Sequence, residues 1–349
     1  MQQASNPPRA DGHDRTDPSD AIGVFDAAPA AASGPSPAAP PVLAIDIGGT
    51  KMAAALVRPD GTVLDRDRTP TPRATDGDQV AQALIDLITP LVGGRPPAAI
   101  GVASAGPIDP IAGTVSPVNI PAWRDYPLMA RIRRAVPGVP AVLVGDAVAM
   151  AAGEHWRGAG SGSTAMLGIV VSTGIGGGLV LRGEPYPGPT GNAGHFGHVV
   201  VDPAGPPCAC GARGCVEAIA SGPAMTHWAR RQGWQGADAR ELAEAARAGD
   251  AIARAAFERG ADALAAGIVA VAAICDLDRV VIAGGVAESG EVLLAPVRRK
   301  VAERAHMDFV KAVQVHRAVL GGDAGLVGAA RFALDLTAAA ELPAAGPEG

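Results

Sequence analysis

Short apolar runs separated by glycine turns recur from Val42 onward, and their spacing predicts β-strands. Longer segments with a helical period follow the strands, so the pattern favours a mixed α/β fold. We expect strands at residues 42–47, 52–58, 62–68, 98–103, 141–145, 164–171, 177–182, 279–283 and 312–318. We expect helices at 77–92, 127–135, 147–156, 221–232, 238–247, 250–274 and 291–305, and a closing helix at about 323–337. A loop rich in proline and glycine is expected at 105–122.

The chain divides into two halves that open in the same way, each with a β-hairpin whose first turn is rich in glycine. These turns are DIGGT at 46–50 and STGIGGG at 172–178. The halves share a pattern rather than residues, which makes the repeat weak. We expect two α/β domains: 41–147, completed by the closing helix at about 323–337, and 148–322.

Residues 1–40 lack any apolar period and carry seven prolines and five aspartates. Such a composition is typical of a disordered tail. It has no apolar core of a signal peptide, and its acidic residues are unlike a transit peptide. We expect either a dispensable extension or a misassigned start, without a function of its own.

Composition narrows the classes of partner. The net charge is −6 with no basic stripe, which argues against a nucleic-acid partner. No apolar run approaches the 18 or more residues of a membrane helix, which argues against a membrane partner. A cysteine-rich loop without signs of export favours a reducing, cytoplasmic setting.

Three of the four cysteines gather with a histidine in eighteen residues, as His198-x9-Cys208-x-Cys210-x4-Cys215. Four soft donors at this density satisfy a tetrahedral Zn²⁺ with no position left for water, so the metal would be structural. The alternatives are a loop with free thiols or with one disulfide. A disulfide is disfavoured because Cys208 and Cys210 are too close in sequence to pair comfortably.

The first glycine turn, residues 46–50, predicts a phosphate site. Asp46 leaves an apolar strand and can hold a Mg²⁺-bound water or orient phosphates. Gly48 and Gly49 permit close approach of the backbone, and Thr50 adds a hydroxyl donor. No helix follows these glycines, which excludes a Walker loop and a dinucleotide fingerprint. Lys51 is either a phosphate ligand or a solvated strand lysine, and an ordinary glycine hairpin is the alternative for the whole turn.

The second glycine turn, residues 172–178, strengthens this prediction. Thr173 and Gly174 would cover the far side of the β- and γ-phosphates. Two facing hairpin turns would bracket a phosphate chain with backbone N–H groups. A site between two domains is also where a small molecule is expected to bind.

Four further side chains are candidates for binding and catalysis. Asp146 ends an apolar strand and opens a helix, so it is either a helix N-cap or a general base that takes a proton from an attacking hydroxyl. Asn119 in an irregular loop either caps a turn or contacts sugar hydroxyls. Glu217 and His198 could face hydroxyls as well, since a metal-bound histidine still presents its other N–H.

Together these motifs resemble the ROK family of bacterial sugar kinases and related repressors. The resemblance covers about residues 42–335, and its cysteine signature is highly specific. The matching segments are DIGGT, ASAGPID…NIPAW, GDAVAMAAGE, VSTGIGGG, GHFGH, CACGARGCVEAIASG and GGDAGLVGAA. The resemblance implies a two-domain actin-like, ribonuclease H-like ATPase fold with a zinc-binding loop. It further implies ATP, Mg²⁺, a structural Zn²⁺ and a homodimer.

The resemblance also assigns roles to residues. Asp146 is implied as the catalytic base. Residues implied to line the sugar site are Gly106, Asn119, His195, His198 and Glu217. Residues implied to contact ATP are Asp46, Gly48, Gly49, Thr50, Lys51, Thr173, Gly174, Gly284 and Gly285. Residues implied to bind zinc are His198, Cys208, Cys210 and Cys215.

Two departures from the family pattern bear on the substrate. Most members carry glutamate where this chain has His195, and those that phosphorylate N-acetylmannosamine look similar in having histidine there. The asparagine that usually precedes the catalytic aspartate is Gly145 here, so one amide contact to the sugar is in doubt. We therefore expect transfer of the γ-phosphate to the C6 hydroxyl of a hexose, with N-acetylmannosamine as the substrate. A glucokinase is the alternative. A sugar-responsive repressor is the third hypothesis, weakened because the 40-residue tail is too short for the usual DNA-binding helices.

Overall fold

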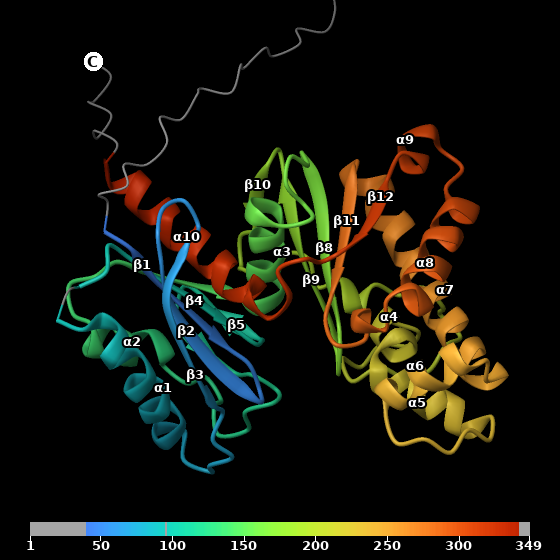
Figure 1. Ribbon diagram of the computed structural model, residues 1–349, viewed down its shortest axis with the longest axis horizontal. Helices are drawn as coiled ribbons and strands as arrows, with labels where there is room; N and C mark the ends of the chain where they lie inside the picture. Colours follow the sequence, from blue (N-terminus) through green and yellow to red (C-terminus); the bar gives the residue numbers. More distant parts are fainter. Residues whose placement is uncertain (1–39, 95, 342–349) are drawn as a thin grey trace, which may run out of the picture. The chain divides into compact units, whose positions relative to one another are not determined.

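The computed structural model describes residues 40–94 and 96–341, and two five-stranded sheets form its framework (Figure 1). The expected tail at 1–40 lies outside the described residues except for Pro40. The first sheet has the order β3-β2-β1-β4-β7. Its strands are β1 Val42–Ile47, β2 Lys51–Val57, β3 Val63–Pro70, β4 Ile100–Ser104 and β7 Ala141–Gly145. The first three strands are antiparallel, whereas β4 and β7 continue the sheet in parallel.

The second sheet repeats this topology. Its order is β10-β9-β8-β11-β12, again with three antiparallel strands followed by two parallel ones. The strands are β8 Ala165–Val171, β9 Ile175–Leu181, β10 Glu184–Tyr186, β11 Arg279–Ala283 and β12 Gln314–Arg317. The predicted duplication is therefore present in the strand order, as expected for an actin-like, ribonuclease H-like α/β fold. The predicted domain boundaries stay a prediction.

Alternation along β1 decides which helices cover each face of the first sheet. Leu43, Ile45 and Ile47 pack in one apolar cluster with α1 (Gly77–Val92) and α2 (Leu128–Ala135). Val42 and Ala44 face the other cluster, where α10 (Ala324–Glu341) packs. Asp46 belongs by alternation to the α10 face. A carboxylate thus enters an otherwise apolar layer at the end of the strand.

Close helix packing places α3 (Asp146–Arg157) against α10. A Cβ on Gly153 would lie 2.3 Å from the carbonyl oxygen of Ala324, and one on Gly328 would lie 1.7 Å from that of Ala149. Only glycine allows backbones to approach this closely. The same helix α3 also contacts β8 and β9.

A further six helices of the described chain pack with the second sheet. The longest of them, α7, contacts each of the other five. The core around this sheet is one large apolar cluster. The helices are α4 Val216–Ala220, α5 Gly222–Arg231, α6 Ala239–Ala248, α7 Ala251–Cys275, α8 Glu291–Arg304 and α9 Asp308–Lys311. In the described part of the chain, no helix is both long enough and apolar enough to span a membrane.

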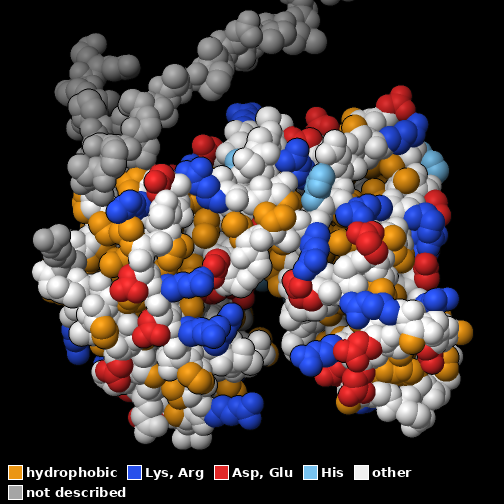
Figure 2. Space-filling view, viewed as in Figure 1, with side chains coloured by type: hydrophobic (Ala, Val, Ile, Leu, Met, Phe, Trp, Pro, Cys, Tyr) orange, Lys and Arg blue, Asp and Glu red, His pale blue; other side chains and the backbone are white. Residues whose placement is uncertain are grey.

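Several elements differ from those expected. The helix expected at 221–232 is α5, and the short helix α4 precedes it. Ser221 separates the two helices. It ends α4, and its hydroxyl caps α5 by accepting a hydrogen bond from the N–H of Ala224. The loop expected at 105–122 contains a small hairpin, β5 (Ile108–Asp109) with β6 (Thr114–Val115). The short elements β10 and α9 were not predicted either. On the face shown in Figure 2, acidic and basic side chains of the described residues are interspersed.

Candidate functional site

The first glycine turn is fixed by its own backbone and by one buried threonine. The N–H of Gly48 donates to the carbonyl of Lys51 at 3.0 Å. The hydroxyl of Thr71 donates to the carbonyl of Gly48 at 2.7 Å, and the N–H of Thr71 donates to that of Thr50 at 3.0 Å. The N–H of Gly48 therefore closes the turn rather than facing a ligand. Thr71 follows β3 and carried no signal in the sequence, because its role depends on a contact between separate strands.

Asn119 lies directly against the first glycine turn. A Cβ on Gly49 would lie 2.3 Å from the Cβ of Asn119, so a larger residue at 49 would displace this side chain. Gly106 lies next to the same loop, because its carbonyl accepts a hydrogen bond of 3.4 Å from the N–H of Val118. The side chain of Asn119 is exposed. A residue expected to bind sugar and a turn expected to bind phosphate are thus in contact.

Arg124 shapes the Asn119 loop, residues 116–124. Its Nη1 donates to three carbonyls of that loop, at 2.9 Å to Pro117, 3.2 Å to Ile120 and 2.6 Å to Trp123. One guanidinium thus ties together three carbonyls of the loop, two of which also accept backbone N–H groups within it. Sequence reasoning did not identify Arg124, since an arginine beside an aromatic residue carries no specific motif.

Two carboxyl groups with raised pKa values lie at the ends of β1 and β7, the two strands that flank β4 in the first sheet. Burial first, and then the charge of Asp146, raise the pKa of Asp46 to about 6, while Lys51 lowers it in part. The backbone of Gly325 at the start of α10 lies close to this carboxyl, since a Cβ there would be 2.6 Å from Oδ2. The side chain of Lys51 reaches the segment directly before α10, with Nζ 3.5 Å from the position of a Cβ on Gly322.

Asp146 is the first residue of α3, and Gly145 occupies the N-cap position. The N-cap alternative for Asp146 is therefore wrong, although its carboxylate accepts a hydrogen bond of 2.7 Å from the N–H of Ala147. Solvent reaches the Asp146 side chain, but the surrounding protein displaces much of its hydration and raises the pKa of the carboxyl. The hydrogen bond from Ala147 opposes this rise. A carboxyl of this kind suits a general base.

The second glycine turn is held from both ends. The N–H of Ser172 donates to the carbonyl of Gly174 at 2.9 Å, and the carbonyl of Ser172 accepts from the N–H of Gly222 at 2.9 Å. Next along the chain, the N–H of Ile175 donates to Oε2 of Glu217 at 2.7 Å. The side chain of Thr173 is exposed at the tip of the turn.

Gly284 and Gly285 follow β11 and lie beside this turn. Gly284 has φ +97°, and a Cβ there would lie 2.4 Å from the carbonyl oxygen of Val171 at the end of β8. The same carbonyl accepts a hydrogen bond of 3.0 Å from the N–H of Val286. Glycine is required at 284 both for its conformation and for this close approach.

A cavity of about 420 Å³ opens between the second glycine turn, Gly285 and the starts of α5 and α6. Its size lies in the range of small-molecule sites. It is lined by Ser172, Thr173, Gly222, Pro223, Thr226, His227, Arg230, Ala237, Asp238, Ala239, Arg240, Gly285 and Val286. Sequence reasoning identified only Thr173 and Gly285 among these, because the wall combines segments about 110 residues apart. A second cavity of about 220 Å³ includes Gly284, Gly285, Glu288, Arg317, Gly321 and Gly322 in its lining.

Two histidines and a glutamate lie together beside the second glycine turn. The rings of His195 and His198 are nearly parallel, with centroids 6.1 Å apart. Burial first, and then His198, lower the pKa of His195, whereas Glu217 raises it in part. Glu217 lies in the first turn of α4. The three side chains offer polar groups of both donor and acceptor type.

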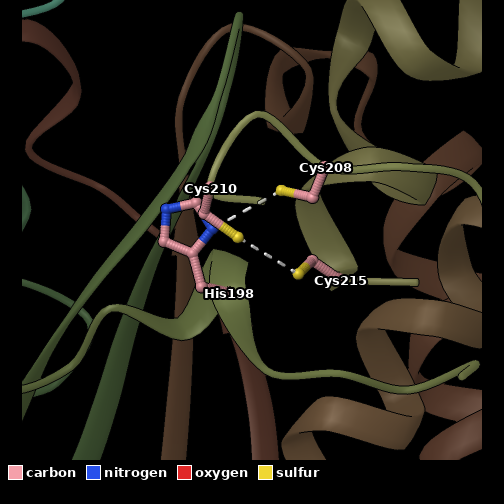
Figure 3. A group of neighbouring side chains, drawn as sticks. All are labelled: His198, Cys208, Cys210 and Cys215. Carbon is pink, nitrogen blue, oxygen red and sulfur yellow. Dashed lines mark hydrogen bonds between the residues drawn. The ribbon is translucent and has the colours of Figure 1, made fainter. Parts of the chain in front are cut away.

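The histidine and the three cysteines of the expected metal loop converge (Figure 3). Their four ligand atoms all lie within 4.8 Å of one another. The sulfurs of Cys210 and Cys215 are 3.7 Å apart, and Nδ1 of His198 is 3.7 Å from the sulfur of Cys208. Two bonds of about 2.3 Å at a tetrahedral angle place sulfurs about 3.8 Å apart, so the donor set fits Zn²⁺.

Of the alternatives for this loop, the disulfide does not fit, whereas free thiols are compatible with the geometry. All four cysteines are free, and 3.7 Å is far beyond the length of about 2.05 Å of a disulfide bond. Burial and the neighbouring thiols raise the pKa of Cys215 to about 12, so a cation is what would stabilise its thiolate. His198 points Nδ1 at the cluster, which leaves Nε2 available for another partner.

The predicted residues thus form two neighbouring groups. Asp46, Gly48, Gly49, Thr50, Lys51, Gly106, Asn119 and Asp146 belong to the ends of strands β1 and β7 and the adjoining loops. Thr173, Gly174, His195, His198, Glu217, Gly284 and Gly285 gather around the second glycine turn. Within the first group, the carboxyls of Asp46 on β1 and Asp146 after β7 are close enough that the charge of Asp146 raises the pKa of Asp46.

Known proteins resemble this chain over most of its length. The model of the ROK family matches residues 42–336. A glucokinase from Thermotoga maritima is 35% identical over 306 residues, which are 83% of this chain and 96% of the relative. An N-acetylmannosamine kinase from Shigella boydii is 40% identical over 295 residues, which are 83% of this chain and 97% of the relative.

Solved structures agree with these sequence relatives. A ROK hexokinase from Thermus thermophilus has a TM-score of 0.75 and 36% identity, over 85% of this chain and 99% of the other. A ROK glucokinase from Streptomyces griseus, in complex with glucose and AMPPNP, has a TM-score of 0.72 and 33% identity, over 84% and 99%.

Proposed function

Because the chain belongs to the ROK family and is a sugar kinase of that family, we propose that it transfers the γ-phosphate of ATP to the C6 hydroxyl of N-acetylmannosamine. The single observation that carries the reaction is the pair Asp46 and Asp146, which lie at the ends of β1 and β7 on either side of β4, close enough for the charge of Asp146 to act on Asp46. Phosphoryl transfer requires mainly positioning and neutralisation of charge, with a carboxylate to accept the proton of the hydroxyl.

Asp146 acts as the general base. Its side chain is open to solvent, and its raised pKa makes it a better proton acceptor than an ordinary aspartate. The α3 backbone holds it through the N–H of Ala147. It accepts the proton of the sugar hydroxyl as that oxygen attacks the terminal phosphate.

Asp46 and Lys51 help to neutralise the negative charge of the phosphates, Asp46 through a bound cation and Lys51 directly. Asp46 is the candidate for holding a divalent cation, because its partly buried carboxylate lies near the end of β1, close to the backbone that begins α10. Bound Mg²⁺ would neutralise phosphate charge. Lys51 carries the complementary charge at the start of β2. The cavity of about 420 Å³ beside Thr173 and Gly285 would receive the nucleoside end of ATP.

The sugar binds between the Asn119 loop and the group His195, His198 and Glu217. His195 supports N-acetylmannosamine as the acceptor, since an imidazole can donate as well as accept where a glutamate only accepts. The 40% identity to the Shigella boydii N-acetylmannosamine kinase supports the same substrate. The 35% identity to the Thermotoga maritima glucokinase supports glucose as the second candidate.

A substrate panel decides between the two sugars. ADP release is measured with N-acetylmannosamine, N-acetylglucosamine, mannose and glucose, and we expect the largest kcat/KM with N-acetylmannosamine. A preference for glucose would replace the first candidate with the second. His195→Glu should lower kcat/KM for N-acetylmannosamine relative to glucose by about tenfold, as for one exchanged hydrogen bond.

The metal loop has a structural role in this proposal. His198, Cys208, Cys210 and Cys215 would bind Zn²⁺ with all four positions taken by protein. The bound ion would fix the chain between His198 and Glu217. The sugar-binding side chains on both flanks then keep their orientation.

A further inference from the structure

We propose that Glu217 is also a positioning residue for the nucleotide, because its carboxylate fastens the second glycine turn. This inference rests on the proposed kinase function but adds a role on the ATP side to a residue assigned to the sugar side. Its basis is the hydrogen bond of 2.7 Å from the N–H of Ile175 to Oε2 of Glu217.

The bond lies next to the residues that would cover the phosphates. Ile175 directly follows Thr173 and Gly174 and begins β9. Its side chain is buried, whereas that of Thr173 is exposed at the tip. The turn is closed on one side by the bond from Ser172 to Gly174 and on the other by the bond to Glu217. Removing the carboxylate leaves the second side without its acceptor.

The carboxylate also fits against the turn by shape. A Cβ on Gly174 would lie 2.8 Å from Oε2 of Glu217, which is closer than side-chain carbons approach an oxygen. Gly174 thus makes room for Glu217, and the pair can be perturbed from either partner. No other glycine of the second glycine turn has Glu217 among its nearest neighbours.

The metal loop sets the position of Glu217. Cys215 is fully buried and occupies the N-cap position of α4, and Glu217 follows two residues later in the first turn. The N–H of Val216 between them donates to the carbonyl of Val199 at 3.0 Å. The backbone next to Glu217 is therefore fixed, and the carboxylate can hold the second glycine turn in place.

Nucleotide binding without any sugar isolates this role. Titration calorimetry of the full chain with Mg²⁺ and AMPPNP should show about tenfold weaker binding for Glu217→Ala than for the wild type, as for the loss of one hydrogen bond to a charged acceptor. Glu217→Gln should recover most of the affinity, because its amide oxygen can accept from Ile175. Glu303→Ala is the control: it removes a carboxylate of α8 that pairs with Arg299 on the exposed surface, and it should leave AMPPNP affinity unchanged.

Hydrogen exchange distinguishes a local effect from a general loss of stability. A local effect changes the exchange rate of amides in one turn, whereas a general loss changes it throughout the fold. The amide of Ile175 should exchange faster in Glu217→Ala and at the wild-type rate in Glu217→Gln, while amides of β11 stay protected in both. If Glu217→Ala misfolds, Gly174→Ala tests the pair from the other side. Its new methyl group should displace the carboxylate and weaken binding of N-acetylmannosamine and glucose as well as AMPPNP.

Two results would overturn the inference separately from the proposed function. Wild-type AMPPNP affinity in folded Glu217→Ala would show that the carboxylate does not position the turn, and the kinase would stand. Wild-type sugar affinity in Gly174→Ala would equally count against the shared contact. If the folded wild type itself failed to bind AMPPNP, the proposed function would fall and this inference with it.

Discussion

Asp146 and Asp46 are two aspartates of one sheet for which we predict different roles. Both carboxyls have raised pKa values, yet Asp146 is reached by solvent while Asp46 lies on the α10 face of β1. We predict proton transfer for the more exposed carboxyl and cation binding for the less exposed one, and each role has its own test.

Asp146→Asn should lower kcat by at least about a hundredfold, since proton acceptance by a positioned base contributes that much or more. The amide keeps the shape of the side chain, so Kd for AMPPNP should change little. Steady-state ADP release gives kcat, and calorimetry gives Kd. A variant that turns over at the wild-type rate would place the base elsewhere.

Asp46→Asn should stabilise the fold at high pH in buffer without divalent cations. The folded state raises the pKa of Asp46 from 3.8 to about 6, so the folded protein holds the proton more tightly. Wild-type stability therefore falls as pH rises through this window, and the full penalty, on the order of 2 to 3 kcal/mol, is present above it.

Urea unfolding at pH 4 and pH 8 measures this effect. The variant should be more stable than the wild type at pH 8 and nearly equal to it at pH 4. A difference that grew toward pH 4 would have the wrong sign. Added Mg²⁺ should narrow the gap at pH 8, because a bound cation stabilises the charged carboxylate.

At the scale of elements, we predict that zinc bound by the metal loop fixes the start of α4. Cys208→Ser, Cys210→Ser or Cys215→Ser should each lower the bound zinc below the value of about one per chain expected for the wild type. Loss of the ion should also lower the melting temperature by roughly 5 °C or more, because binding to the folded state stabilises it.

Elemental analysis and thermal scans with and without a chelator test this prediction. Cys275→Ser is the control, since Cys275 lies at the end of α7 outside the cluster. Wild-type protein free of zinc after expression with the metal present would contradict the assignment. Sugar KM should rise in the three loop variants, as the flanks at His198 and Glu217 loosen.

Packing between α3 and α10 depends on glycine at the points where the two helix backbones meet. Gly328→Ala would place a methyl group 1.7 Å from the carbonyl oxygen of Ala149, so the helices must separate. We expect a loss of about 2 kcal/mol or more in the free energy of unfolding. Turnover should fall too, because α3 begins with Asp146.

Thr337→Ala is the matched control in α10. Its hydroxyl bonds only within the helix, to the carbonyl of Leu334 at 2.7 Å, so its removal should change the unfolding free energy by less than about 1 kcal/mol. Equal stability of the two variants would mean that the helices tolerate separation. Urea unfolding at one pH compares them directly.

The sequence predicted elements well where one period continued over a whole segment. The helix at Gly77–Val92 and the strands at Val42–Ile47, Ala141–Gly145 and Arg279–Ala283 have the predicted bounds. Two-residue strands such as β5 and β6 were missed because no period can show in so short a run. The helix expected at 221–232 corresponds to α5, whereas the five-residue helix α4 before it was missed because so short a segment shows no helical period.

For the whole molecule, local motifs predicted the residues of the glycine turns and the metal loop, but not the contacts that hold them. Thr71 and the walls of the 420 Å³ cavity bring together segments that are distant in the sequence. Such contacts follow from the tertiary fold, which no spacing along the chain encodes. The family roles of the site residues and the expected homodimer stay predictions, and light scattering of the purified chain would test the latter.

On the proposed function, a single molecule should be able to occupy both parts of the site, because Gly49 of the first glycine turn and Asn119 of the Asn119 loop are in contact. Tethering two ligands makes the second binding event intramolecular, at a high effective concentration. A hexose joined through its C6 oxygen to the terminal phosphate of a nucleotide should therefore bind far more tightly than either half. Lengthening the tether should erode the gain, so a graded series of such inhibitors would act as a molecular ruler for the site in solution.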